Sequence, residues 1–212
     1  MRIATLLALS LAAALGISSP KPISAQASPA TVIPAENAIA LQVSTGTYMQ
    51  AADGKDEWTE AKSFQAGSPV WARVAIANLT DHVAYLHLHG ELPPFGITLK
   101  DGNGLVPEFT EIGCRMHFCA QATSNSGQLS AIVLSGMGAT WTLNPRETIV
   151  KYVDVSREFQ LSKPGSYQMS LLRTNFVISG ATKKEEVFSG KSGGRTEVGP
   201  VRSNTVKFQI LP

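Results

Sequence analysis

The chain has 212 residues, 43% of them hydrophobic, with 18 Lys and Arg side chains against 16 Asp and Glu. This length and apolar content are enough for one well-packed core, and β-sandwiches of such size often form a single domain. The charge balance argues against a nucleic-acid partner, which usually selects a basic face or stripe. The longest basic cluster, Lys183 and Lys184, is followed at once by Glu185 and Glu186.

The N-terminus has the pattern of a signal peptide over residues 1–27. Arg2 supplies a positive charge, residues 3–17 form an apolar run, and residues 25–27 read Ala-Gln-Ala, the small-x-small form that a signal peptidase cleaves. A membrane anchor is the alternative, but the run is shorter than the roughly 20 residues that a bilayer needs. We therefore expect a secreted or periplasmic product with no membrane span.

Removal of that segment also changes the charge balance. Arg2 and Lys21 leave with it and no acidic residue does, so basic and acidic side chains become equal in number. The remainder divides into an extended N-terminal lead over residues 28–38, which contains two prolines, and one domain over residues 39–212.

Apolar and polar residues alternate with a period of two through most of this domain, which predicts β-strands. The clearest case is residues 70–77, whose even positions are all apolar. The expected strands are residues 40–48, 70–77, 83–89, 97–100, 106–112, 148–155, 167–173 and 205–211.

The connection between two of these strands has a specific turn sequence. Residues 101–104 read Asp-Gly-Asn-Gly, and these residue types tolerate positive φ. We therefore expect residues 97–100 and 106–112 to form a hairpin. A period of 3.6 is nearly absent, and a short helix over residues 57–64 is the one helical expectation.

The most specific local signal precedes the penultimate strand. In immunoglobulin-type sandwiches a tyrosine at this place packs at a corner and bonds back to the backbone, two positions before an inward-facing residue. Tyr167, preceded by Pro164 and Gly165, has this spacing. Met169 takes the inward position that a cysteine has in antibody domains, so we expect an apolar inward site without a disulfide.

Three motifs together resemble secreted bacterial immunoglobulin-like modules of the fibronectin-like and macroglobulin-like kind. Residues 164–167 match PG-x-Y, residues 203–210 match SN-x-V-x-F-x-I, and residues 67–78 match G-x-PV-x-x-x-V-x-I-x-N. The resemblance covers residues 64–78 and 145–211. It implies an all-β fold, an immunoglobulin-like antiparallel β-sandwich with two long loop insertions. It implies no particular function, because such folds serve many.

The two insertions are residues 113–146 and 175–203. Both exceed the usual connection length of about 2 to 6 residues, and such excursions are usually functional or disordered. The second reads as a protruding hairpin that gives way to a Gly/Ser-rich segment, and its candidate binding residues are Phe188, Lys191 and Arg195. A flexible, solvated loop without a role is the alternative.

Cys114 and Cys119 are the only cysteines of the chain. Oxidising compartments favour bridging, so we expect a disulfide that closes a small loop and stabilises the fold by roughly 2 kcal/mol. A redox-active pair is the alternative, but four residues separate these cysteines where the familiar oxidoreductase motif has two.

His87 and His89 are two apart on a predicted strand, so both project from one face and can begin a metal site. His82, Met116 and His117 are further possible ligands, although no fixed spacing relates them to the pair. The alternative is that residues 84, 86 and 88 form the buried face. Both histidines are then ordinary side chains on the outer surface of the sheet.

Catalytic motifs are not found in the sequence: it has no G-x-S-x-G elbow, no phosphate-binding P-loop and no H-E-x-x-H. We expect neither an enzyme nor a cofactor. The leading hypothesis is a non-catalytic module that binds another protein or a cell-surface component through its sandwich loops. The alternatives are an extracellular proteinase inhibitor that uses residues 190–195 and an extracytoplasmic metal-binding protein that uses His87 and His89.

Overall fold

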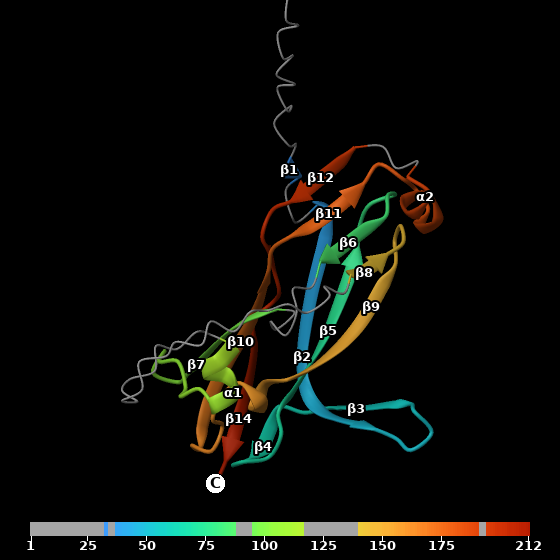
Figure 1. Cartoon of the computed structure of the whole chain (residues 1–212). Helices are drawn as coiled ribbons and strands as arrows, with labels where there is room; N and C mark the ends of the chain where they lie inside the picture. The colour runs from blue at the N-terminus through green and yellow to red at the C-terminus, as the bar shows by residue number, and fades with distance from the viewer. Residues whose placement is uncertain (1–31, 34–36, 88–94, 117–139, 191–193) are drawn as a thin grey trace, which may run out of the picture.

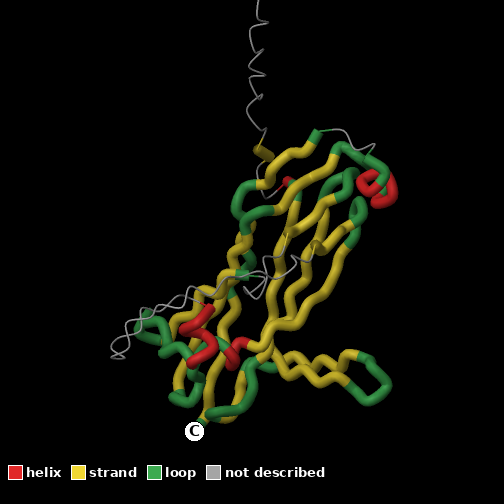
Figure 2. The backbone as a smooth tube through the Cα atoms, viewed as in Figure 1, coloured by secondary structure: helices red, strands yellow, loops and turns green. Residues whose placement is uncertain are grey.

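The computed structural model describes residues 32–33, 37–87, 95–116, 140–190 and 194–212. Most of these residues lie in strands, and the helices, red in Figure 2, are short. The strands form three open sheets with mainly antiparallel pairing, so the chain is all-β, as its alternation predicts. No helix in the described ranges is long and apolar enough to cross a bilayer.

Sheet 1 is built around a strand of 12 residues, β2. All its pairs are antiparallel, and its order is β3 (Asp56–Glu60), β2 (Ile39–Gln50), β5 (Trp71–Asn78) and β9 (Thr148–Asp154). The end of β2 and the whole of β3 form a hairpin that extends from the body as an arm (Figure 1).

Sheets 2 and 3 contain the remaining strands. Sheet 2 has the order β13 (Val201–Arg202), β10 (Gly165–Arg173), β14 (Val206–Leu211) and β4 (Ser63–Gln65), and β7 (Gly96–Asp101) also pairs with β10. Sheet 3 has the order β1 (Val32–Ile33), β12 (Arg195–Val198), β11 (Phe176–Ser179), β6 (Ala84–His87) and β8 (Thr140–Leu143). The helices are α1 (Glu111–Met116), η2 (Val155–Arg157) and α2 (Lys184–Phe188).

Sheets 2 and 3 meet end to end because the chain passes directly from one into the other. After two residues β10 is followed by β11, and after two residues β12 is followed by β13. The register is the same on both sides of this break, with Arg173 opposite Val201 and Phe176 opposite Val198. Pro200 has no N–H and Asn175 has a φ of 67°, so the ladder is interrupted here.

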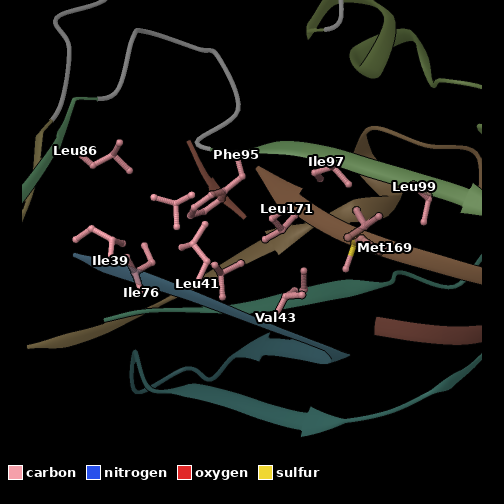
Figure 3. Close-up of a cluster of buried hydrophobic side chains, with 14 of the residues drawn as sticks. Ile39, Leu41, Val43, Ile76, Leu86, Phe95, Ile97, Leu99, Met169 and Leu171 are labelled. Atoms are coloured by element: carbon pink, nitrogen blue, oxygen red, sulfur yellow. The ribbon is translucent and has the colours of Figure 1, made fainter. Parts of the chain in front are cut away.

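One hydrophobic core lies between sheet 1 and the layer formed by the other two sheets. Figure 3 shows side chains of sheet 1 (Ile39, Leu41, Val43, Ile76) across from side chains of sheets 2 and 3 (Leu86, Ile97, Leu99, Met169, Leu171). Each such side chain contributes about 1.5–3 kcal/mol when it is fully removed from water. The alternation predicted for residues 70–77 is confirmed, because the even positions are buried and the odd ones are half-buried.

Two predicted local structures are wrong. Residues 57–64 form no helix, because this segment pairs as β3 with β2 and then as β4 with β14. Residues 106–112 form no strand. The predicted turn does form, and the Asp101 carboxylate accepts N–H bonds from Asn103 and Leu105, but β7 then pairs with the distant β10.

The second long stretch, residues 175–203, is not an excursion from the sheets. The hairpin that the sequence predicts exists as β11 and β12, but both strands belong to sheet 3, and Phe176 is buried. The described part of their connection contains the short helix α2. Of residues 113–146, most of α1 and the whole of β8 are described, whereas residues 117–139 lie outside the described ranges.

The corner predicted at Tyr167 is confirmed. Its hydroxyl donates a hydrogen bond to the carbonyl oxygen of Lys163 at 2.8 Å, and its ring stacks on Phe208 with a centroid distance of 5.6 Å. Burial raises the pKa of the Tyr167 hydroxyl above its ordinary value. Met169 is fully buried, so the inward apolar site is confirmed as well.

At one edge of the sandwich, the inward-pointing side chain of Lys151 on β9 contacts Trp141 on β8. Lys151 stands opposite the buried Val74, and its ammonium lies over the ring of Trp141 at 4.9 Å from the centroid. This cation–π contact connects sheet 1 to sheet 3. An inward-pointing lysine also makes an edge strand less able to pair with another chain.

Candidate binding surface

The solvent-facing side of sheet 1 brings together side chains from β2, β5 and β9. Strand register places two rows across these strands, namely Ser44, Arg73 and Tyr152, and then Gln42, Ala75 and Val150. Alternation along β5 leaves the odd positions of this strand facing outward and half-buried, while the even positions enter the core. The surface is therefore held on rigid strands rather than on loops.

Four aromatic side chains form one cluster at the end of this face where the arm begins. We call Tyr48, Trp58, Trp71 and Tyr152 the aromatic cluster. Tyr48 stacks on Tyr152 with centroids 4.4 Å apart and meets Trp71 at 4.8 Å, and Trp58 meets Tyr152 at 5.6 Å. Each ring is half-buried, so the cluster is packed internally yet still open to solvent.

Gly46 makes this packing possible. A Cβ atom at position 46 would lie 2.6 Å from the Trp58 ring and 2.2 Å from the carbonyl oxygen of Thr59. Because Gly46 has no side chain, Trp58 lies over its backbone beside the rest of the aromatic cluster. Covering a glycine in this way with an aromatic ring across the strand pair also helps to hold the register of the arm.

Two carboxylates border the aromatic cluster. The Tyr48 hydroxyl donates a hydrogen bond of 2.7 Å to Asp56, and this bond raises the pKa of the Tyr48 hydroxyl. Asp154 stands opposite Trp71 and accepts a bond from the backbone N–H of Arg157, which caps η2. Burial raises the pKa of the Asp154 carboxyl above its usual range.

Hollows lie on two sides of the aromatic cluster. Arg73 lines a cleft of about 530 Å³ that runs from the outer face of sheet 1, past Glu60 and Lys62, to β14. Tyr48 and Trp71 line a second hollow of about 430 Å³ together with β4. We call the first of these the Arg73 cleft. The cluster therefore borders the second hollow directly, and the Arg73 cleft begins at the next row of sheet 1.

The sequence-predicted binding residues lie elsewhere. Arg195 begins β12, and its guanidinium lies 5.8 Å from the centroid of the Tyr85 ring. Phe188 ends α2, but its side chain is outside the described part of the chain, as is the whole of Lys191. Arg195, whose side chain is described, does not line the Arg73 cleft.

The predicted metal and disulfide residues are only partly described. His87 ends β6 with its side chain undescribed, and His89 and Cys119 lie outside the described ranges. Cys114 lies on α1 and is half-buried. The part of the chain that the structure describes contains no group of three or more His, Cys, Asp or Glu side chains that could hold a metal ion. Residues at odd positions of β6 were expected to lie with the histidines on the outer surface of the sheet. Tyr85, which is one of them, is only 4% exposed, so this face is buried at Tyr85.

Among the described residues, several groups with displaced pKa values have local partners. The Arg146 guanidinium lowers the pKa of the Asp81 carboxyl through an ion pair at 2.9 Å. Glu108 raises the pKa of the Lys163 ammonium through an ion pair at 3.0 Å. These pairs are exposed and lie in different parts of the fold, so they are surface ion pairs of small energetic weight.

Sequence reasoning missed the aromatic cluster and Arg73. The alternation at residues 70–77 was the available signal, because it places Trp71 and Arg73 together on the outer face of β5. The other cluster members come from β2, β3 and the distant β9, so only the pairing of the strands brings them to one place.

Comparison with known proteins finds no matching family model, no matching curated protein and no matching solved structure. The function of this chain therefore has to be inferred from its own surfaces.

Proposed function

We propose that this chain is a non-catalytic, exported binding module with an immunoglobulin-like sandwich, and that it binds another protein through the outer face of sheet 1. The observation that carries this proposal is the aromatic cluster beside Arg73 on the solvent side of β2, β3, β5 and β9.

The strand order supports an immunoglobulin-like topology. Such sandwiches place the first, second and fifth strands in one sheet and the third, sixth and seventh in the other. Here β2, β5 and β9 are neighbours in sheet 1, and β7, β10 and β14 are neighbours in sheet 2, with β10 in the middle. The hydrogen bond of Tyr167 to the backbone of Lys163 adds the corner typical of these domains.

The composition of the surface supports protein recognition. Residues that dominate binding energy at protein interfaces are enriched in Trp, Tyr and Arg and cluster in well-packed places. The outer face of sheet 1 combines the aromatic cluster with Arg73, and Gln42 and Ser44 form a polar border. This arrangement matches an interface centre with a polar rim.

The rigidity of the surface also favours binding. Tyr48 and Tyr152 are already stacked, so their rings lose little rotamer freedom when a partner covers them. Because strands carry these side chains, the surface is preorganised, in contrast to the flexible Gly/Ser-rich loop that the sequence suggested as the binding site. The hollows beside the aromatic cluster offer places where a partner's side chains can insert.

The test is a charge placed on this face, one row from Arg73. Val150→Glu keeps every aromatic ring, but it places a carboxylate in the row of Gln42 and Ala75. The wild-type protein is used to capture partners from the extracellular fraction of cells that produce it. We expect Val150→Glu to weaken capture of these partners about tenfold or more, since an unpaired charge is then buried in the interface.

The matched control is Val106→Glu, which makes the same substitution at a residue that is 55% exposed after β7. This variant should capture the wild-type set of partners. Thermal unfolding shows whether both variants fold like the wild type. An identical partner set with Val150→Glu would contradict the placement of the binding site on sheet 1.

A further inference from the structure

A row of amide and ammonium groups crosses the outer face of sheet 2. Gln168 on β10 stands opposite Lys100 on β7 and opposite Lys207 on β14. All three side chains are exposed, because their neighbours Met169, Leu99 and Phe208 enter the core. The two lysines are two strand spacings apart, or roughly 10 Å.

Two clefts meet at the end of this row. Lys62 and Lys207 line both the Arg73 cleft and a second cleft of about 500 Å³ over β10 and β14. Polar side chains of the second cleft include Ser63, Ser166 and Gln209, and the buried rings of Tyr167 and Phe208 also line it. The two clefts therefore share one cationic border and form a groove along this end of the sandwich, which we call the lysine groove.

The cations of the lysine groove lack partners within the described part of the protein. Lys62, Arg73 and Lys207 form no ion pair there, and neither does Lys100 at the far end of the row, outside both clefts. In contrast, the described ion pairs hold Lys55, Arg115, Arg146 and Lys163 on carboxylates. Two acidic residues border the groove. Glu60 lines the Arg73 cleft, and Asp101 lines the second cleft with its carboxylate already bonded to the turn at Asn103 and Leu105.

We propose that the lysine groove binds an acidic polysaccharide, with the lysines and Arg73 on its carboxylate or sulfate groups. Lysine acts as a point charge toward such anions, and Arg73 can contact a carboxylate with two N–H groups. The amides and hydroxyls between the cations can hydrogen-bond sugar hydroxyls. An elongated groove with charges spread along it suits a linear polymer better than a compact anion.

Other anionic partners fit this groove less well. Single-stranded nucleic acid is usually held by aromatic side chains on which the bases stack, but Tyr167 and Phe208, which line the second cleft, are both buried. Membrane surfaces are bound by basic helices with an apolar face that enters the lipid, and this groove is built on strands with polar side chains.

The experiment measures binding of fluorescein-labelled oligogalacturonate to the purified full chain by fluorescence anisotropy. We expect binding that weakens as salt rises, because exposed charges are screened within about 10 Å at 0.1 M. Lys62→Gln combined with Lys207→Gln should weaken it roughly tenfold. Neutral dextran oligomers of equal length should not compete.

The control variant combines Lys55→Gln with Arg146→Gln, which removes the same charge from cations that are paired outside the groove. This variant should bind oligogalacturonate as the wild type does. Equal losses in the two double variants would overturn the site, and tighter binding of single-stranded DNA or of anionic vesicles would overturn the polysaccharide. Trp58→Ala serves to separate the two proposals. Trp58 belongs to the aromatic cluster and lines neither cleft of the lysine groove, so this variant should leave oligogalacturonate binding unchanged whether or not sheet 1 binds a protein.

Discussion

The side-chain amide of Asn204 bonds to the backbone of Val43 as a neighbouring strand would. Its Oδ1 accepts a bond from the Val43 N–H at 2.7 Å, and its Nδ2 donates to the Val43 carbonyl at 3.0 Å. Val43 lies on β2 in sheet 1, and Asn204 lies between β13 and β14 of sheet 2, two residues before β14 begins. One side chain therefore joins two sheets along β2, next to the isolated bridge between Leu41 and Ser203.

Asn204→Ala should destabilise the fold by about 1–3 kcal/mol, because it leaves both backbone groups of Val43 without their partner. Urea unfolding at equilibrium measures this loss. Gln168→Ala, an exposed amide on the same sheet, is the control and should stay within about 0.5 kcal/mol of the wild type. Equal stability of the two variants would show that water replaces the amide at no cost.

Tyr167→Phe removes only the hydroxyl that bonds to Lys163 and keeps the ring against Phe208. We expect a loss of about 1 kcal/mol, since the Lys163 carbonyl loses a part-buried donor. The comparison is Tyr48→Phe, whose bond to Asp56 is exposed and should contribute less. If thermal unfolding ranks these variants in the opposite order, the corner at Tyr167 does not hold the turn before β10.

Gly46→Ala should destabilise the arm by about 2 kcal/mol or more, because its methyl group would overlap the Thr59 carbonyl and the Trp58 ring. Tryptophan fluorescence should change as Trp58 leaves the aromatic cluster. Gly54→Ala is a useful comparison, since position 54 has free space around it and its strain comes only from a φ of 80°. A wild-type fluorescence spectrum for Gly46→Ala would contradict the close packing of Trp58.

Asp154→Asn should stabilise the fold at neutral pH. Burial raises the folded-state pKa of the Asp154 carboxyl, so folding favours the protonated form. The stability from this group is therefore present below its unfolded pKa of about 3.9 and is lost as pH rises through the folded value. Asparagine keeps an oxygen that can cap η2 but carries no charge.

The measurement for Asp154 is urea unfolding of both proteins as a function of pH. The stability gap should be widest at neutral pH and should narrow below about pH 4, where the aspartate itself becomes protonated. A variant that is less stable than the wild type at neutral pH would mean that the carboxylate charge favours the cap more than burial opposes it.

The framework was largely predictable because its strongest signals are local. The alternation at residues 70–77 and 205–211 and the spacing around Tyr167 each depend on a few neighbouring residues. Residues 57–64 were misassigned because their polar stretch has no clear period, and only pairing with β2 and β14 makes them strands. For the same reason β7 was given a local partner, although it pairs with β10.

The candidate surfaces were harder to predict because they depend on long-range register. Tyr48 on β2 and Tyr152 on β9 meet only because both strands pair with β5 in sheet 1. Lys100, Gln168 and Lys207 form a row only because β10 lies between β7 and β14. Neither relation can be read from spacing along the chain.

The interruption at Asn175 and Pro200 divides the hydrogen-bond ladder in one layer of the molecule but not in the other. Sheet 1 runs as one ladder along β2 and β5, whereas the opposite layer has separate ladders on each side of the break. Sheet 3 can therefore open while sheet 2 and its lysine groove stay intact. Amide protons of β11 and β12 should then exchange with solvent sooner than those of β10 and β14.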